Sequence, residues 1–101
     1  MTPIEVNDFL DIPSFKEEWP EFKAVDKCDR EKISPDMEVL VRRSGEDIVI
    51  RIESVNDQVL VGKVLTKKFY FEQPFQTGDF VQFFKKNVIN IYDIERTGVL
   101  Y

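Results

Sequence analysis

Hydrophobic and polar residues alternate along the chain from residue 37 onward, the pattern of strands that bury one face. The clearest run is residues 47–55, where Ile48, Ile50 and Ile52 point to one side and the residues between them to the other. Shorter runs of the same kind occupy residues 37–43, 58–65, 80–84 and 88–94. With no long helical period beside them, these runs predict a mainly β protein, with five or six strands in a small, strongly bent antiparallel sheet or barrel.

Turn-forming residues separate the runs. The segments 44–47 and 56–57 each predict a hairpin turn, and Thr77-Gly78-Asp79 predicts a tight entry into the strand that follows, because glycine adopts positive φ freely and Asp accepts local hydrogen bonds. Residues 66–76 form a longer connection, within which we expect a short edge strand at Phe69–Phe71. Gly62 predicts a bulge or a close backbone neighbour. Successive hairpins favour a meander of the SH3-like or OB-like kind.

The first third of the chain has a different pattern. Residues 1–36 contain four of the five prolines, and prolines at this spacing exclude a long helix. We therefore expect an extended arm with short helical turns after Asn7 and Ser14, a β domain over residues 37–95 and a tail over residues 96–101. The arm is too apolar to be a solvated tail, and it packs either on its own sheet or on another chain.

The segment from residue 47 to residue 94 resembles an uncharacterised family of small β-barrel domains of the SH3-like type, found in bacterial and large-DNA-virus proteins. The resemblance rests on the pattern F-x-x-G-D-x-V-x-F, here Phe75 to Phe83, followed by N-V-I-x-I, here Asn87 to Ile91. It covers about half of the chain and implies a fold without a known chemistry. The N-terminal arm lies outside it.

Length and charge limit the class of protein. A chain of 101 residues with 43% hydrophobic and 33% charged residues predicts one ordered domain. Eleven acidic and five basic side chains fall within residues 1–38, so the arm carries the acidity, which argues against broad binding of phosphate backbones. The single cysteine excludes an intrachain disulfide. With no signal-peptide pattern and no long apolar run, we expect a soluble intracellular protein, cytoplasmic or virion-associated.

The side-chain pairs that most often carry catalysis are missing from this chain. The chain has no histidine, and Cys28 is its only cysteine. Ser-His and Cys-His pairs and a Cys/His zinc site are therefore excluded. Neither a P-loop nor a G-x-G-x-x-G motif is present. The remaining carboxylates, such as Glu17 with Glu18, lack the spacing of a calcium loop. We therefore expect a non-enzymatic protein without a catalytic, cofactor or metal site and without a small-molecule substrate.

Aromatic residues point instead to protein contacts. Nine Phe, three Tyr and one Trp are many for this length, and in the run FVQFF both faces are apolar, so that either the arm or a partner covers the second face. We expect a structural or protein-interaction module, for example a small component of a larger assembly such as a minor protein of a virus particle. The expected interface residues are Phe9, Phe15, Trp19, Phe22, Phe69, Tyr70, Phe71, Phe80 and Phe84.

Two other functions stay open. The lysine pairs Lys67-Lys68 and Lys85-Lys86 lie beside aromatic residues, the combination used for single-stranded nucleic acid, although the acidic arm opposes this interpretation. The other alternative is an acidic inhibitor or immunity-type protein that blocks a basic site through Glu17, Glu18 and Glu21.

Overall fold

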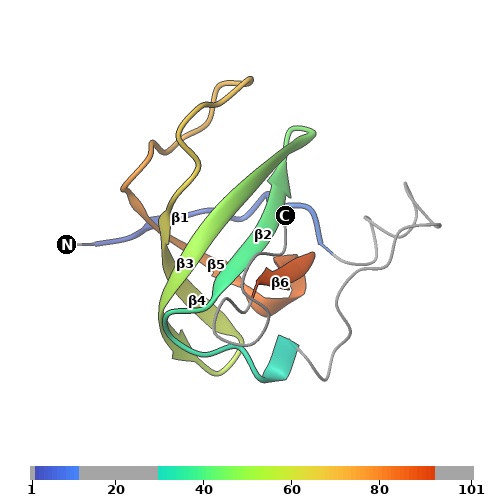
Figure 1. Ribbon diagram of the computed structural model, residues 1–101, viewed down its shortest axis with the longest axis vertical. Coiled ribbons are helices and arrows are strands. Elements are labelled where there is room, and N and C mark those ends of the chain that lie inside the picture. Colours follow the sequence, from blue (N-terminus) through green and yellow to red (C-terminus); the bar gives the residue numbers. More distant parts are fainter. Residues whose placement is uncertain (1, 12–29, 93–101) are drawn as a thin grey trace.

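The computed structural model describes residues 2–11 and 30–92 of the chain. Within them, six strands form one mixed sheet in the order β1-β5-β4-β3-β2-β6 (Figure 1). The strands are β1 (Ile4–Glu5), β2 (Glu38–Arg43), β3 (Glu46–Asn56), β4 (Val59–Val64), β5 (Phe80–Phe84) and β6 (Asn90–Tyr92). This confirms the prediction of a small, mainly β protein.

The sheet is built on an antiparallel meander from β2 to β5. After β5, one turn of 3₁₀ helix, η1 (Lys85–Asn87), leads to β6, which returns to pair antiparallel with β2. At the other edge β1 runs parallel to β5, with Ile4 opposite Val81. This parallel pair is the exception to the antiparallel sheet that the sequence predicted. Among the described residues β1 and β6 are not paired with each other, and the sheet is open.

Two tight turns connect the long strands. Ser44 and Gly45 join β2 to β3, and both have positive φ, 56° and 76°, the conformation that follows the twist of a two-residue hairpin. Asp57 and Gln58 join β3 to β4. The first turn ends two residues earlier than expected, since Glu46 is already paired in β3 and its side chain is buried. The second turn lies one residue later than expected.

Gly62 combines the two features expected of it. It lies opposite Ile52, where the register between β3 and β4 shifts at a bulge. A Cβ atom at this position would lie 2.6 Å from the carbonyl oxygen of Arg51 and would also meet Ile50. The close approach of β3 to β4 therefore requires a residue without a side chain.

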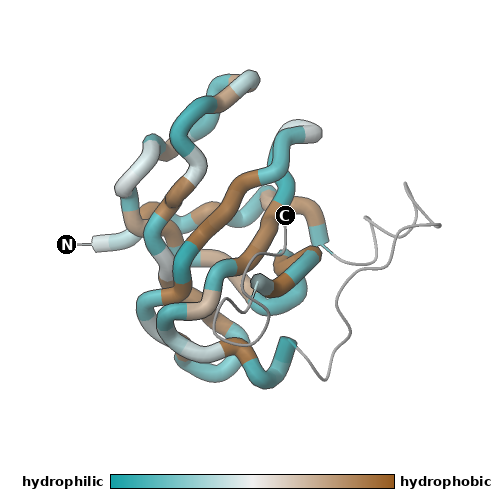
Figure 2. Tube along the Cα trace, in the orientation of Figure 1, coloured by the Kyte–Doolittle hydropathy of each residue, from teal (hydrophilic) through white to brown (hydrophobic). Residues whose placement is uncertain are grey.

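Buried and exposed side chains alternate along β3, as predicted. Ile48, Ile50 and Ile52 are fully buried, while Arg51 and Glu53 are exposed. The apolar segments gather along the strands in the body of the molecule, and polar segments occupy most of the connections (Figure 2).

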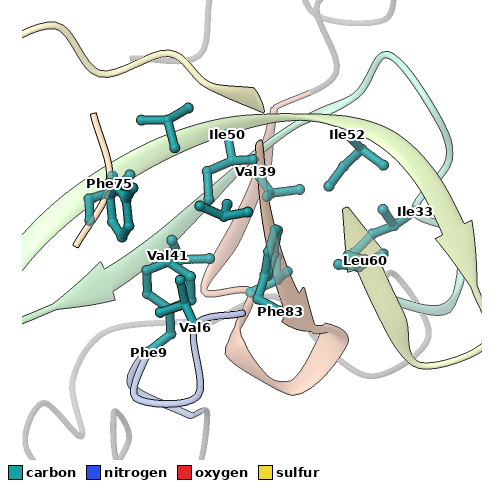
Figure 3. Close-up of a cluster of buried hydrophobic side chains, with 14 residues drawn as sticks. Val6, Phe9, Ile33, Val39, Val41, Ile50, Ile52, Leu60, Phe75 and Phe83 are labelled. Atoms are coloured by element: carbon teal, nitrogen blue, oxygen red, sulfur yellow. The ribbon is translucent and has the colours of Figure 1, made fainter. Parts of the chain in front are cut away.

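Part of the N-terminal arm belongs to this core. Val6 and Phe9 are buried, and the Phe9 ring packs edge-on against Phe83 with centroids 5.7 Å apart (Figure 3). Residues 4–9 therefore pack on the chain's own sheet, which answers for this segment the question that the sequence left open. The helical turn expected after Asn7 is absent from residues 7–11, where the Leu10 N–H instead donates to the Arg42 carbonyl at 2.8 Å.

Candidate functional site

The connection between β4 and β5, residues 65–79, is the longest loop in the described part of the chain and extends beyond the sheet (Figure 1). We call it the β4–β5 loop, and we call residues 67–72 at its outer end the aromatic tip. The edge strand expected at residues 69–71 does not form. The N–H groups of Tyr70 and Phe71 donate to a side-chain carboxylate instead of to a neighbouring strand.

Hydrogen bonds close the base of the loop. Thr66 accepts from the Val49 N–H at 2.8 Å through its hydroxyl oxygen, and its carbonyl accepts from the Thr77 hydroxyl. The Gly78 N–H donates to the Val64 carbonyl at 2.8 Å, with Gly78 at a φ of 90°. The tight turn predicted at residues 77–79 is therefore present, and it brings the two ends of the loop together.

The aromatic tip carries the two large hydrophobic side chains that are exposed in the described residues. Tyr70 is 79% exposed and Phe71 54% exposed. Lys67 and Lys68 are exposed beside them, and Lys68 Nζ lies 5.9 Å from the centre of the Tyr70 ring. The tip thus presents two aromatic side chains and two cations to the surroundings.

A buried carboxylate fixes the backbone of the tip. Glu46, on the buried face of β3, accepts hydrogen bonds from the Tyr70 N–H at 2.7 Å, the Phe71 N–H at 3.3 Å and the Gln73 side-chain amide at 2.9 Å. Burial raises the pKa of Glu46, but these hydrogen bonds outweigh it and the pKa lies below its usual value of 4.5. Glu46 is therefore ionised at neutral pH and receives the donors that a charged acceptor needs.

A series of hydrogen-bonded side chains, which we call the polar chain, continues from Glu46 and Gln73 to the N-terminal segment. Arg43 donates from Nη1 to the Gln73 side-chain oxygen at 2.9 Å, and from Nε and Nη2 to the two oxygens of Asp8 at 2.9 and 2.7 Å. The Arg43 hydrogen bonds hold the pKa of Asp8 below its usual value, although partial burial opposes them. Four side chains thus link the N-terminal segment to the tip.

A row of aromatic rings makes a second link. Phe69 turns inward from the tip and packs against Phe75 at a centroid distance of 5.9 Å and an interplanar angle of 75°. Phe75 is buried and lies 5.9 Å from Phe9. The base, the backbone and the inner ring of the loop are therefore all anchored, and Tyr70 and Phe71 are held outward.

The other predicted site residues are distributed over several environments. Phe80 and Phe84 are half-buried on the face of β5 opposite Val81 and Phe83, and Lys86 Nζ lies 5.7 Å from the centre of the Phe84 ring. Lys85 is buried and forms an ion pair with Glu31 at 3.4 Å.

Two of the predicted contacts are thus internal. Phe9 is a core residue, and the Lys85 side chain is buried and paired with the partly exposed Glu31, so neither Phe9 nor Lys85 is available to a partner. Phe15, Trp19 and Phe22 lie outside the described residues, as do the acidic residues Glu17, Glu18 and Glu21.

Sequence reasoning did not single out Asp8, Arg43, Glu46 or Gln73. One signal was present, because Glu46 falls on the same alternating positions as Ile48 and Ile50. A carboxylate on the buried face of a strand must find hydrogen-bond donors. Which donors it finds depends on a loop more than twenty residues away in sequence, and no local pattern indicates that contact.

In residues 2–11 and 30–92 no group of His, Cys, Asp and Glu side chains is placed to hold a metal ion. No helix in that part of the chain is long and apolar enough to cross a membrane.

Comparison with protein-family models, with curated proteins and with solved structures found no match to this chain.

Proposed function

We propose that this protein is a non-enzymatic interaction module that binds another protein through the aromatic tip of the β4–β5 loop. The observation that carries the proposal is the 79% and 54% exposure of Tyr70 and Phe71 on a loop anchored at its base and along its backbone. Aromatic residues are enriched at the centres of protein interfaces. A loop that is already fixed loses less conformational entropy on binding.

The chemistry of the partner site follows from the tip. Tyr70 and Phe71 fit an apolar pocket, and the exposed Lys67 and Lys68 favour acidic side chains at the rim of that pocket. Of the aromatic residues expected at an interface, the proposal retains Tyr70 and Phe71 of the loop and leaves out the rings of the strand FVQFF, which are buried or half-buried.

Photo-crosslinking tests the proposal directly. A photoreactive phenylalanine at position 70 is expected to crosslink to a defined protein from the native source. The same group at Asn56 is the matched control, because Asn56 is the exposed last residue of β3 and pairs with Val59, at the end of β4 farthest from the loop. The captured protein is then purified, and its affinity is measured for the wild type and for the double variant Tyr70→Ser, Phe71→Ser. We expect the variant to bind at least about tenfold more weakly; equal affinity contradicts the proposal.

Membership of a larger assembly, such as a virus particle, is the more specific form of this proposal. It was suggested by surplus apolar residues in the arm and by the resemblance to small SH3-like barrels. The return of β6 to the first strand of the meander supports a barrel-like arrangement. The packing of Val6 and Phe9 on the chain's own sheet removes part of the surplus. Identification of the crosslinked protein tests the assembly directly.

Binding of single-stranded nucleic acid is the second candidate, and the exposure of Lys67 and Lys68 beside Tyr70 favours it. Aromatic stacking with phosphate neutralisation is the mechanism such a site uses. The burial of Lys85 reduces the basic surface that the sequence suggested. Titration with fluorescent single-stranded DNA and RNA at low salt decides: binding that weakens in Lys67→Ala, Lys68→Ala supports this candidate, and absence of binding removes it.

A further inference from the structure

The N-terminal segment and the aromatic tip are linked by two independent sets of contacts that start from adjacent residues. Asp8 begins the polar chain that passes through Arg43 and Gln73 to Glu46. Phe9 begins the row of rings that passes through Phe75 to Phe69. The segment that carries Asp8 and Phe9 lies far from the tip in sequence, yet it takes part in both series of contacts that hold the tip.

The segment itself is held by contacts with β5, with η1 and with β2. β1 pairs with β5, and the Val6 N–H continues this ladder to the Gln82 carbonyl at 3.0 Å. The buried amide of Asn87 donates to the Phe9 carbonyl at 3.1 Å and accepts from the Phe84 N–H at 3.0 Å. At its end, the Leu10 N–H donates to Arg42, the residue before Arg43.

From this arrangement we infer that docking of residues 4–10 regulates the binding site, by holding the aromatic tip in the conformation that presents Tyr70 and Phe71. With the segment docked, Asp8 orients the Arg43 guanidinium, which orients Gln73, and Gln73 with the two backbone N–H groups surrounds the Glu46 carboxylate. With the segment undocked, Arg43 loses the partner that receives two of its three hydrogen bonds, and Phe75 loses a ring against which it packs. The tip then samples other conformations, and its affinity for a partner falls.

The inference rests on the proposed function only for its last step. The effect of Asp8 on the conformation of the tip is measurable in the free protein, without a partner. The Tyr70 and Phe71 amide protons report it, because both are bonded to Glu46 and exchange with solvent when that bond opens.

The experiment compares amide hydrogen exchange by NMR in the wild type, in Asp8→Ala and in Asp47→Ala. Asp47 is the control because it lies on the same hairpin and its ion pair, at 2.7 Å, is with Arg42 and not with a residue of the loop. Asp8→Ala is suited to the test because the Asp8 side chain is 63% exposed, so its removal leaves the core intact. We expect Asp8→Ala to speed exchange at Tyr70 and Phe71 about two- to tenfold. The Ile52 amide, which is bonded to the Met37 carbonyl, should keep its rate, and Asp47→Ala should leave all three rates unchanged.

In the free protein, two results overturn the inference: unchanged rates at Tyr70 and Phe71 in Asp8→Ala, or an equal rise at all three amides, which indicates general destabilisation. Once crosslinking has identified a partner, its affinity for Asp8→Ala provides the second measurement. If Asp8→Ala loosens the tip and also weakens binding, the regulatory role is supported. If it loosens the tip while binding is unchanged, the regulatory role is overturned. If Tyr70→Ser, Phe71→Ser binds as the wild type does, the proposed function fails, and the exchange data still decide the mechanical coupling.

Discussion

Asp8 and Arg43 form a two-point ion pair, with Nε of Arg43 2.9 Å from one carboxylate oxygen and Nη2 2.7 Å from the other. The pair joins the extended N-terminal segment to the last residue of β2. Its exposure is uneven, since the Arg43 side chain is 20% exposed and the Asp8 side chain 63%. Solvent around the carboxylate screens the attraction, so we expect the pair to contribute more to the position of the Arg43 side chain than to the stability of the whole fold.

A double-mutant cycle tests this expectation. The free energy of unfolding is measured by urea denaturation for the wild type, Asp8→Ala, Arg43→Ala and the double variant. We expect a coupling energy of about 0.5–1 kcal/mol, the range of exposed ion pairs. A coupling above about 2 kcal/mol would contradict it, and would mean that changes at the aromatic tip in Asp8→Ala report loss of global stability.

The burial of individual phenylalanines predicts very different costs of truncation. Phe83 is fully buried and packs against Phe9, so Phe83→Ala is expected to reduce the free energy of unfolding by about 3–5 kcal/mol. Phe71 is the matched control at the exposed tip, and Phe71→Ala should change it by no more than about 0.5 kcal/mol. Urea denaturation of the two variants gives both values. A large loss in Phe71→Ala would show that this ring supports the fold and would weaken the case for it as a contact residue.

Gly62 provides a test of the close approach between β3 and β4. Gly62→Ala places a Cβ against Ile50 and the Arg51 carbonyl, and we expect a loss of about 1–3 kcal/mol, as for other overpacked positions. Gly45 is the control because a Cβ there meets no atom within 4 Å, so that a side chain strains only the backbone at its φ of 76°. Asparagine tolerates positive φ better than most residues, and we expect Gly45→Asn to lose less stability than Gly62→Ala. If Gly62→Ala is as stable as Gly45→Asn, the two strands are farther apart than described.

The comparison between sequence and structure shows where local patterns suffice. The period of two in residues 48–52 predicts both the strand and its buried face, because burial of alternate side chains is a local property. The turns were placed within one or two residues. The parallel pairing of β1 with β5 was not predicted, since two residues carry no periodicity and their pairing depends on a partner more than seventy residues away.

For the candidate site, local sequence patterns do not suffice. Tyr70 and Phe71 were among the aromatic residues expected at an interface, but the sequence could not separate them from Phe9, which is buried, or from Phe69, which turns inward. That difference is decided by tertiary contacts of the loop. The residues that position the tip, Asp8 and Glu46 above all, act through contacts between distant parts of the chain, and their residue types are ordinary for a surface.

The two carboxylates of the polar chain predict how the protein responds to acid. Both Asp8 and Glu46 have pKa values below their usual 3.8 and 4.5, so the folded state binds protons more weakly than the unfolded state does. Their contribution to stability is therefore complete above about pH 5. It is lost as the pH falls through these values toward the lower pKa values of the folded protein. Titration of the side-chain carboxyl carbons by NMR should place both midpoints below the usual values, and urea denaturation from pH 7 to pH 3 should show the accompanying loss of stability.

Variants identify which carboxylate is responsible. Glu46→Gln and Asp8→Asn each remove one titrating group, so each should show a shallower fall in stability between pH 5 and pH 3 than the wild type. Protonation of Glu46 also weakens the acceptor of the Tyr70 and Phe71 amides, and exchange at these two positions, corrected for its intrinsic pH dependence, should rise over the same interval. Glu46→Gln should show a smaller rise because its side chain does not titrate, and the rise that remains should come from protonation of Asp8. If the rise persists unchanged in Glu46→Gln, another group controls the tip at low pH, and the assignment of Glu46 as the acceptor that fixes the tip is wrong.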